Sequence, residues 1–433
     1  MKNKKKLVYV AFSDDILHEG HFKILKKASS LGNVVVGLLT DEAIASYKTL
    51  PYYNFKQREL IIKNMKYVKR VVKQNMLDYT ENLKLLKPHY VVHGDDWKKG
   101  IQKNTRKKVI KTLKSWSGKL IEIPYTKNIS KTEVKEKIIK TGTTPDIRKT
   151  KLKRLVNAKN IVRILESHST LTGLIIENLK ITKKKEFLEF DGMWSSSLTD
   201  SALRGKPDNQ SVDYSTRILG LNEILEVTTK PMIFDADNGG RLEHLPFMIK
   251  SLERIGVSAV IIEDKVGLKK NSLFKNQKGT KQDSIKSFCK KISKAKETKI
   301  SDDFFIIARI ESFILGKNLK DAINRAEAYS KAGADAILIH SKENNPSQIF
   351  SFSKKFIKSK YYKPLVAVPS SYSKTYEKEL LKNGFKIVIY ANHMMRASYP
   401  AMLNVAKSIL INKRSFNMEK KISPIKEVIN LIK

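Results

Sequence analysis

The sequence predicts two α/β domains, a smaller one with an open parallel sheet and a larger one built as an eight-stranded parallel barrel. Its 433 residues are more than one ordinary domain needs and leave room for a barrel of roughly 250 residues. Short apolar runs alternate with helix-like segments in both parts, which is the pattern of repeated βαβ units. Many of these runs stop abruptly at charged or hydroxyl residues, as buried parallel strands do where they open onto a site.

Residues 1–145 form the smaller of the two expected domains. Strands are expected at 7–12, 33–39 and 90–92, and an amphipathic helix at 21–31. This alternation predicts a parallel sheet that binds ligands where strands end and helices begin. His18-Glu19-Gly20-His21 lies at such a place, between the first strand and its helix. Two imidazoles and the helix-start amides could grip a triphosphate there, although histidines at a helix start can also act only as caps.

Residues 6–140 resemble the cytidylyltransferase-like nucleotidyltransferases. Besides the HEGH segment, the resemblance rests on HGDDW at 93–97 and NISKT at 128–132. It implies a Rossmann-like nucleotidyltransferase fold that uses CTP and Mg²⁺ to form a CMP-linked product and pyrophosphate. It assigns nucleotide binding to eight residues: Asp15, His18, His21, Lys48, Arg58, Asp95, Ser130 and Thr132. Phe12, Asp14 and Tyr125 depart from the family's pattern and leave the activity and the acceptor of this domain open.

A basic, weakly periodic stretch separates the two parts. Residues 146–160 read as a linker with a short helix, because they follow Gly, Thr and Pro and carry many Lys and Arg. The barrel is then expected to occupy residues 161–433. Eight apolar runs with polar tips predict its strands: Ile161–Leu165, Phe187–Met193, Met232–Phe234, Ala259–Ile262, Phe304–Ala308, Ala336–Ile339, Leu365–Val368 and Ile387–Tyr390.

Carboxylates cluster at the tips of the third and fourth of these runs. Asp235 and Asp237 are two residues apart, so an extended backbone directs both side chains to one side. Glu263 and Asp264 follow the next run, and four carboxylates at one mouth repel each other unless a cation lies among them. Oxygen ligands without cysteine indicate Mg²⁺, held partly through water and substrate. The alternative is a pair of solvated acidic turns.

Polar residues at other tips could complete an anion-binding site. Lys265, Lys269 and Asn271-Ser272 belong to a glycine-containing loop that could close over a substrate and exclude water. Arg309 could bind a carboxylate or phosphoryl group in bidentate fashion, unless it is a buried strut to Glu311. His340 could donate to a phosphoryl group or be only structural, and the turn at 194–198 could offer amides to an enolate oxygen.

Residues from about Val162 to the C-terminus resemble the phosphoenolpyruvate mutases of the isocitrate lyase superfamily. EDKVGLKKNS at 263–272 fits the signature EDKxxxKxNS, and DADNGG at 235–240 resembles the metal-binding segment. The resemblance implies Mg²⁺-dependent isomerisation of phosphoenolpyruvate to 3-phosphonopyruvate, with no redox cofactor. It makes Asp208, Lys269, Asn271, Arg309 and His340 catalytic; Trp194, Ser196, Ser197, Leu198, Lys265 and Ser272 substrate-binding; and Asp235, Asp237 and Glu263 metal-binding. Ser197 stands where many relatives have glycine.

Other activities stay open as alternatives. C–C lyases of the superfamily use a cysteine in the loop corresponding to 265–272, and Cys289 lies beyond that loop. Phosphonopyruvate hydrolases are closer, but their loop differs near Asn271. A nucleotidyltransferase joined to a non-catalytic barrel is the remaining alternative. If both domains are active, the fusion suggests that the smaller one activates a phosphonate.

The bulk composition limits partners and compartment. Lys and Arg number 84 against 43 Asp and Glu, a net charge of +41. The lysines are spread along the chain without a nucleic-acid-binding signature, so we expect a field that attracts phosphorylated substrates and no nucleic acid. A single cysteine and the absence of a long apolar segment favour a cytoplasmic protein without a membrane span. The resemblance of the barrel implies a homodimer or homotetramer that exchanges a C-terminal helix.

Overall fold

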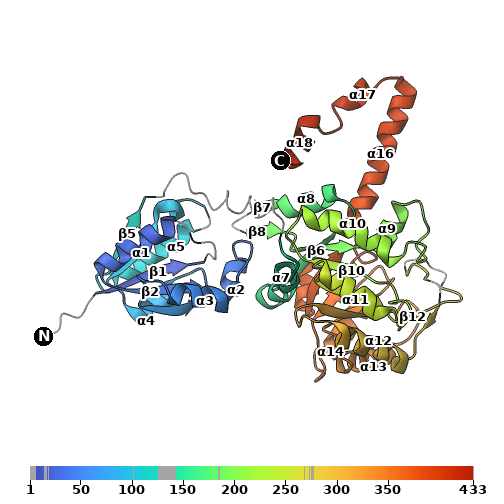
Figure 1. Ribbon diagram of the computed structural model, residues 1–433, viewed down its shortest axis with the longest axis horizontal. Coiled ribbons are helices and arrows are strands. Elements are labelled where there is room, and N and C mark those ends of the chain that lie inside the picture. Colours follow the sequence, from blue (N-terminus) through green and yellow to red (C-terminus); the bar gives the residue numbers. More distant parts are fainter. Residues whose placement is uncertain are drawn as a thin grey trace. The chain divides into compact units, whose positions relative to one another are not determined.

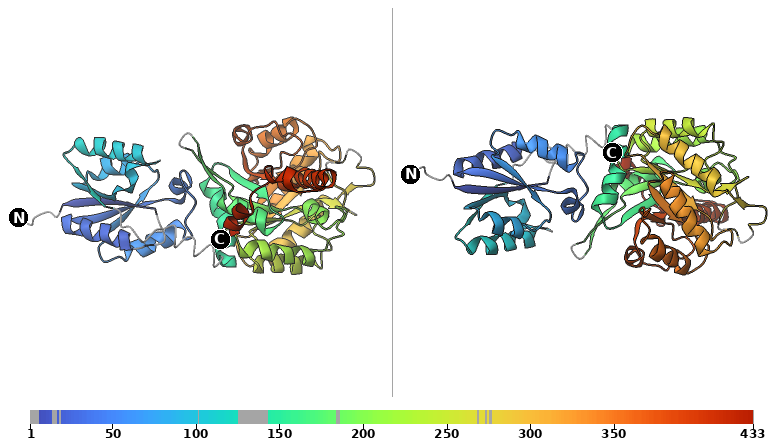
Figure 2. Two further views of the ribbon diagram at one scale, coloured as in Figure 1. Left: turned by 90° about the horizontal axis from the view of Figure 1, so that it is seen from above. Right: turned by 90° about the horizontal axis from the view of Figure 1, so that it is seen from below.

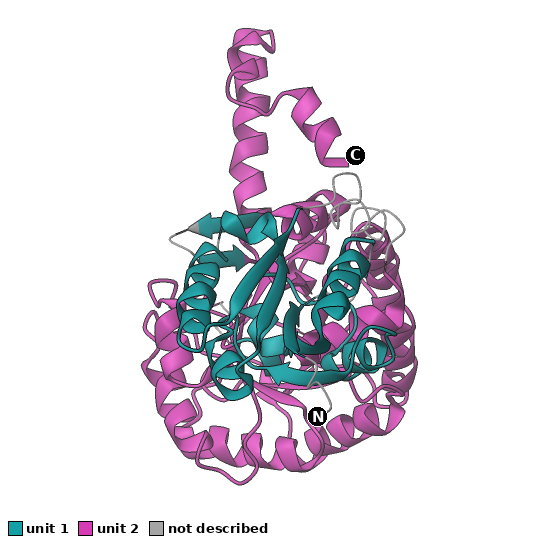
Figure 3. Ribbon diagram, turned by 90° about the vertical axis from the view of Figure 1, so that its left-hand side faces the viewer, with its two compact units in different colours: residues 1–138, 157–159, 180–188 teal, residues 139–156, 160–179, 189–433 magenta. Residues whose placement is uncertain are grey.

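The computed structural model describes residues 6–13, 17, 19–100, 102–124, 143–183, 186–267, 269–272, 274 and 277–432. The chain divides into two compact units (Figure 3). One comprises residues 1–138, 157–159 and 180–188, and the other comprises residues 139–156, 160–179 and 189–433.

The smaller unit contains the expected open parallel sheet. Its strands lie in the order β3-β2-β1-β4-β5, where β1 is Leu7–Phe12, β2 Asn33–Leu39, β3 Arg70–Gln74, β4 Tyr90–Gly94 and β5 Lys119–Ile123. The helices are α1 (Glu19–Leu31), α2 (Asp41–Ala45), α3 (Phe55–Lys63), α4 (Thr80–Leu86) and α5 (Lys103–Lys114), with a 3₁₀ turn η1 at Asp95–Lys98. The prediction of this fold is confirmed.

Helices cover both faces of this sheet, which explains why its strands are continuous apolar runs. Along β1, Val8 and Val10 pack with Leu25 of α1 in one buried cluster. Tyr9 faces the other way and packs with Leu83 of α4 and with α5. Successive side chains of a strand point to opposite faces, so two covered faces require apolar residues at every position.

The larger unit is a closed barrel of eight parallel strands, as the sequence predicts. In barrel order from β10 these strands are β10 (Met232–Asp235), β11 (Ala259–Glu263), β14 (Phe305–Ile310), β15 (Ala336–Ile339), β16 (Leu365–Ala367), β17 (Phe385–Tyr390), β6 (Val162–Glu166) and β9 (Gly192–Ser195). Figure 2 shows the helices arranged around the barrel. They include α8 (Thr170–Asn178), α9 (Ser197–Ala202), α10 (Tyr214–Glu226), α11 (Leu245–Arg254), α12 (Ile285–Thr298), α13 (Leu319–Lys331), α14 (Ser347–Phe356) and α15 (Glu377–Lys382).

One expected strand is divided into two. Residues 187–193 contain the end of β8 (Glu186–Glu189), which pairs with β7 (Lys180–Lys183), and the start of β9. Between them Asp191 turns inward, where its carboxylate accepts a hydrogen bond from Arg163 N at 2.8 Å. Gly192 follows because a Cβ there would lie 2.8 Å from Pro231 O. The buried Asp191 carboxylate and the close approach of Pro231 O to Gly192 therefore divide the expected strand in two, although most of its residues are apolar.

The expected linker forms a helix of the barrel unit. Residues Pro145–Ala158 are α7, and its basic side chains donate to backbone carbonyls near the start of β10. Arg148 Nη2 donates to Leu225 O at 2.6 Å, and Lys151 Nζ donates to Thr229 O at 2.8 Å. The basic run thus satisfies buried carbonyl groups, while the domain boundaries proposed from the sequence stay predictions.

The chain ends in a helical arm that Figure 1 shows extending from the barrel. It consists of α16 (His393–Asn412), α17 (Phe416–Glu419) and α18 (Ile425–Ile432). Neither α16 nor α18 has a buried residue. Glu166, at the tip of β6, accepts hydrogen bonds from Met394 N and Met395 N and so attaches the start of α16 to the barrel. Within the described residues, no helix has the length and hydropathy needed to cross a membrane.

Candidate active sites

The barrel has a cavity at the C-terminal ends of its strands, where sequence reasoning placed the chemistry. It is lined by most of the residues expected there: Trp194, Ser196, Ser197, Leu198, Asp208, Asp235, Lys269, Asn271, Ser272, Arg309 and His340. Asp237, Glu263 and Lys265 are not among the lining residues. Each is buried and contacts one of them, namely Lys269, Arg309 and Ser272 respectively. The structure therefore brings all of the expected barrel residues together.

The loop after β11 is closed over this cavity. The hairpin of β12 (Lys265–Val266) and β13 (Lys281–Gln282) forms its base. At its centre, Lys269 Nζ donates to Asp208 Oδ1 at 2.7 Å and Asn271 Nδ2 donates to Asp208 Oδ2 at 2.8 Å. Both oxygens of one carboxylate are thus held by the loop. Burial opposes the charge on Lys269, but Asp237, Asp235 and Asp208 outweigh it and raise the pKa of the ammonium above its ordinary value.

A second buried network lies around Arg309 on β14. Its Nε donates to Glu311 Oε1 at 2.6 Å, and its Nη2 donates to His340 Nδ1 at 2.9 Å. Glu311 also pairs with Lys265 at 2.9 Å. Burial and then the Arg309 cation lower the pKa of His340, so the imidazole is neutral at pH 7. Arg309 therefore is a strut to Glu311, the alternative considered from the sequence, and also lines the cavity.

Asp235, Asp237 and Glu263, at the tips of β10 and β11, are the carboxylates expected to bind Mg²⁺. Glu263 Oε1 is buried and has no hydrogen-bond partner among the described residues. Burial raises the pKa of Glu263 to about 7 although Arg309 and Lys265 lower it, so a divalent cation bound there would favour the ionised form. Within the described stretches, no three His, Cys, Asp or Glu side chains gather closely enough to hold a metal ion. Mg²⁺ bound through Asp235, Asp237 and Glu263 would consequently retain water or substrate ligands.

Asp264 does not join these carboxylates. Its oxygens accept hydrogen bonds from Glu311 N at 2.9 Å and from Tyr329 OH at 2.8 Å, and Arg325 lies 3.2 Å away. Adjacent residues at a strand end point to opposite sides, so Glu263 and Asp264 diverge. The expectation that four carboxylates converge on the mouth is wrong for Asp264, which instead anchors the base of the loop.

Sequence reasoning also missed Arg217 on α10. This arginine is 2% exposed, donates to Asp235 O at 2.6 Å and to Asp200 Oδ2 at 2.7 Å, and lies over the ring of Phe234. It holds the backbone at Asp235, the first of the carboxylates expected to bind metal. The available signal was a lone arginine within the apolar periodicity of the helix, which ordinarily indicates a solvent-facing position.

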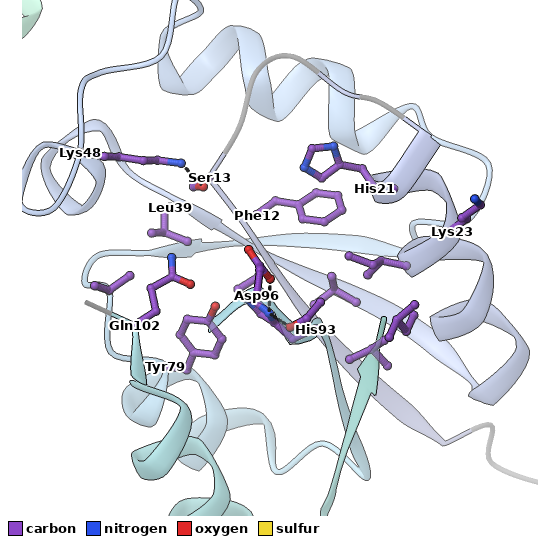
Figure 4. A pocket seen from close by; sticks show the side chains of 18 of the residues that line it. Phe12, Ser13, His21, Lys23, Leu39, Lys48, Tyr79, His93, Asp96 and Gln102 are labelled. Carbon is purple, nitrogen blue, oxygen red and sulfur yellow. Dashed lines mark hydrogen bonds and ion pairs between the residues drawn. The ribbon is translucent and has the colours of Figure 1, made fainter. Parts of the chain in front are cut away.

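The smaller unit has a pocket at the C-terminal ends of its strands (Figure 4). Of the residues expected to bind nucleotide, His21 and Lys48 line it, and Lys48 Nζ donates to Ser13 Oγ at 2.7 Å. His93 also lines the pocket and stacks on Trp97 with ring centroids 3.8 Å apart. Burial lowers the pKa of His93, so this imidazole is neutral at pH 7. The pocket thus combines a lysine with aromatic walls.

Two further nucleotide-binding candidates, Arg58 and Asp95, are not among the residues that line this pocket. Arg58 is 1% exposed and supports the end of β2, where it donates to Leu39 O at 2.9 Å and to Asp41 Oδ1 at 2.8 Å. Asp95 is not a lining residue among those described and pairs with Lys98 at 3.6 Å, whereas its neighbour Asp96 lines the pocket. Asp15, His18, Ser130 and Thr132 lie outside the described residues.

Comparison with protein families finds one matching family for each part of the chain. The family described as phosphoenolpyruvate phosphomutase matches residues 152–410, well over half of the chain. The chain belongs to the phosphoenolpyruvate phosphomutase family. A second family, described as cytidylyltransferase-like, matches residues 14–137. The resemblances stated from the sequence are thereby confirmed.

Individual relatives agree with this assignment. A phosphoenolpyruvate phosphomutase of Tetrahymena pyriformis is 36% identical over 284 residues, 65% of this chain and 90% of the relative. A phosphonopyruvate hydrolase of Variovorax sp. (strain Pal2) is 32% identical over 269 residues, 62% of this chain and 91% of the relative. The glycerol-3-phosphate cytidylyltransferase of Bacillus subtilis (strain 168) is 31% identical over 144 residues, 31% of this chain and 97% of the relative.

A solved structure resembles the barrel as well. The phosphoenolpyruvate phosphomutase from Streptomyces platensis subsp. rosaceus superposes with a TM-score of 0.61 at 33% identity and covers 67% of this chain and 95% of its own. The phosphonopyruvate hydrolase structure has a TM-score of 0.58 at 29% identity over 67% of this chain and 95% of its own. Mutase and hydrolase relatives are thus nearly equally similar, and residues of the site must distinguish them.

Proposed function

We propose that the barrel isomerises phosphoenolpyruvate to 3-phosphonopyruvate. In this reaction the bond between phosphorus and the enol oxygen breaks, a bond between phosphorus and C3 forms, and no atom is gained or lost. The observation that carries the proposal is the closed loop. Lys269 and Asn271 together hold Asp208 over a cavity whose other wall is Arg309 and His340. A phosphoryl group released there meets cationic and amide groups and little water.

Each wall of the cavity suits one part of the substrate. Ser196, Ser197 and Leu198 line the cavity at the start of α9, where backbone amides can stabilise the enolate oxygen of the pyruvate portion. Arg309 and neutral His340 can hold the phosphoryl oxygens as the group moves. Mg²⁺ held by Asp235, Asp237 and Glu263 would supply neutralising charge for the carboxylate and enolate oxygens.

Asp208 can align the moving group because it is itself held at both oxygens. Lys269 and Asn271 occupy the two carboxylate oxygens, and the side chain is 10% exposed. Fixing a reacting group in this way removes alternative geometries that would admit attack by water. The same contacts close the loop, so one movement both positions Asp208 and excludes water from the cavity.

Phosphonopyruvate hydrolysis is the second candidate, because a hydrolase is among the relatives at 32% identity. The two activities differ in product. We expect ³¹P NMR of the protein with Mg²⁺ and phosphonopyruvate to show phosphoenolpyruvate. Free phosphate together with pyruvate would identify a hydrolase. Phosphonopyruvate recovered unchanged would indicate the non-catalytic barrel.

We further propose that the smaller unit is a CTP-dependent cytidylyltransferase acting on a phosphonate or phosphate acceptor. The pocket of His21, Lys48 and stacked His93 supports a ligand with phosphates and an aromatic base. Incubation with CTP, Mg²⁺ and a series of acceptors such as 2-aminoethylphosphonate should release pyrophosphate. Absence of release with every acceptor would remove this half of the proposal.

Assembly and location are proposals of the same kind. The arm from α16 to α18 exposes many apolar side chains, among them Leu410 and Ile425 at 78% and 79%, which supports a homodimer or homotetramer. Sedimentation equilibrium measures this directly, and a monomer at micromolar concentration would exclude it. The free thiol of Cys289 supports a reducing, cytoplasmic compartment.

A further inference from the structure

Ser197 lies between the loop and a metal-binding carboxylate. It is the first residue of α9 and is 4% exposed. Its Oγ donates to Asp235 Oδ2 at 2.8 Å and accepts a hydrogen bond from Lys269 Nζ. The proposed reaction uses the backbone amide of this turn and gives the hydroxyl no task.

The three groups form a chain with one possible direction. An ammonium can only donate and an ionised carboxylate can only accept, whereas a hydroxyl does both. Lys269 therefore donates to Ser197, and Ser197 donates to Asp235. Lys269 supplies the positive charge at one end of this chain, and the Asp235 carboxylate accepts at the other end. Hydrogen bonds to charged groups are stronger than neutral ones, and more so when buried.

No other side-chain contact in the described residues joins Lys269 to Asp235. Its remaining partners are Asp208 at 2.7 Å and Asp237 at 2.5 Å, the latter without the geometry of a hydrogen bond. The backbone N–H of Ser197 is 3.4 Å from the same Asp235 oxygen, which is a long contact. The hydroxyl of Ser197 is consequently the close link between Lys269 and the Asp235 carboxylate, whereas Lys269 contacts Asp237 directly.

We propose that Ser197 is a positioning residue that couples closure of the loop to the orientation of the Asp235 carboxylate. When the loop opens, Lys269 leaves and the Ser197 hydroxyl loses the donor that fixes its rotation. Asp235 then loses a fixed donor in turn. By thermodynamic reciprocity, a cation that favours the held orientation of Asp235 favours the closed loop by the same factor. The inference rests on the proposed function only in treating 265–272 as a gate.

Proteolysis of the full-length protein tests the coupling without reference to activity. Phe274 is 61% exposed on the loop and is a chymotrypsin site that no substitution below removes. Cleavage after Phe274, followed by mass spectrometry, reports loop opening. In the wild type we expect Mg²⁺ to slow this cleavage. In Ser197→Ala we expect roughly tenfold faster cleavage, the size of one hydrogen bond to a charged group, and loss of most of the Mg²⁺ effect.

Three further variants make the result specific. Ser197→Thr keeps the hydroxyl and should restore the Mg²⁺ effect. Ser330→Ala removes a buried hydroxyl of α13 that has no hydrogen-bond partner among the described residues, and should cleave at the wild-type rate. In a Lys269→Met background, Ser197→Ala should add little, because both changes break the same chain of hydrogen bonds.

The outcomes separate this inference from the proposed function. Wild-type cleavage and a full Mg²⁺ effect in Ser197→Ala would overturn the coupling, as would independent, additive effects of Ser197→Ala and Lys269→Met. A protein that shows the coupling but forms no phosphoenolpyruvate from phosphonopyruvate would retain the inference and lose the mutase proposal. Melting temperatures of all variants exclude global unfolding as the source of faster cleavage.

Discussion

The cavity of the barrel and the pocket of the smaller unit both lie where parallel strands end, yet they treat charge differently. In the barrel, the charges are buried and matched: Lys269 is 7% exposed and Asp208 10%. In the described part of the smaller pocket, Asp96 is 56% exposed, and the Lys23–Glu19 pair is exposed at about half of each side chain. A dry, matched cavity suits a small anion that must be shielded from water. An open pocket suits a larger ligand that keeps part of its hydration.

Removing Asp208 should break the barrel side of this comparison most severely. Asp208→Ala leaves Lys269 and Asn271 without their shared acceptor, so the loop loses its contact across the cavity. We expect a roughly 10²–10³-fold lower rate of phosphoenolpyruvate formation from phosphonopyruvate. Asp302→Ala, an exposed position before β14, is the control and should react like the wild type. A loss below tenfold for Asp208→Ala would show that the loop closes without it.

Neutralising Glu311 tests whether the matched charges stabilise the barrel. Glu311 is fully buried and faces Arg309, Lys265 and His340. Glu311→Gln leaves the buried cations of Arg309 and Lys265 with less compensation, and we expect the free energy of unfolding to fall by about 3 kcal/mol. Glu377→Gln removes the partner of Arg163 in a more exposed pair, whose side chains are 20% and 26% exposed, and should cost about 1 kcal/mol or less. Equal losses in urea denaturation would contradict the distinction between buried and exposed pairs.

The pH dependence of Mg²⁺ binding tests whether the barrel cavity buries its charges as described. Burial raises the pKa of Glu263 to about 7, so the folded state holds this proton more tightly than the unfolded state. Without a metal, this group's contribution to stability is present below its unfolded pKa and is lost as pH rises through 7. Mg²⁺ competes with the proton, so its affinity should fall by about tenfold per pH unit below 7. Calorimetric titration measures this, and Glu263→Gln should abolish the dependence.

The smallest effect is expected at an ion pair of the smaller unit. Hydrogen bonds from Arg106 lower the pKa of Glu122 to about 2, against a smaller raising effect of burial, and Trp97 also donates to it. This stabilisation is present above the unfolded pKa of Glu122 and is lost as pH falls toward 2. Glu122→Gln should cost less than about 1 kcal/mol at pH 7 and should flatten the acid limb of the stability curve. An unchanged acid limb would assign acid unfolding to other groups.

The ends of the barrel strands could be predicted from the sequence because apolar residues give way abruptly to charged residues there. Asp235 follows the run at 232–234, and that pattern alone locates a barrel mouth. Networks in which one side chain contacts several others could not be predicted from the sequence in the same way. Glu311 looks like a partner of Arg309, but its simultaneous contacts with Lys265 and His340 depend on strands far apart in sequence. Arg58 carries a family role by resemblance, whereas its buried contacts with Leu39 and Asp41 arise from the packing of α3.

Helix α7 decides where the barrel can be separated from the rest of the chain. A fragment that starts at residue 161, the expected first residue of the barrel, would lack Arg148 and Lys151 and leave the carbonyls of Leu225 and Thr229 buried without donors. A fragment that starts ahead of Pro145 retains both. Separating the two proposed activities on different polypeptides should therefore use a boundary before this helix, and the shorter fragment would be expected to aggregate.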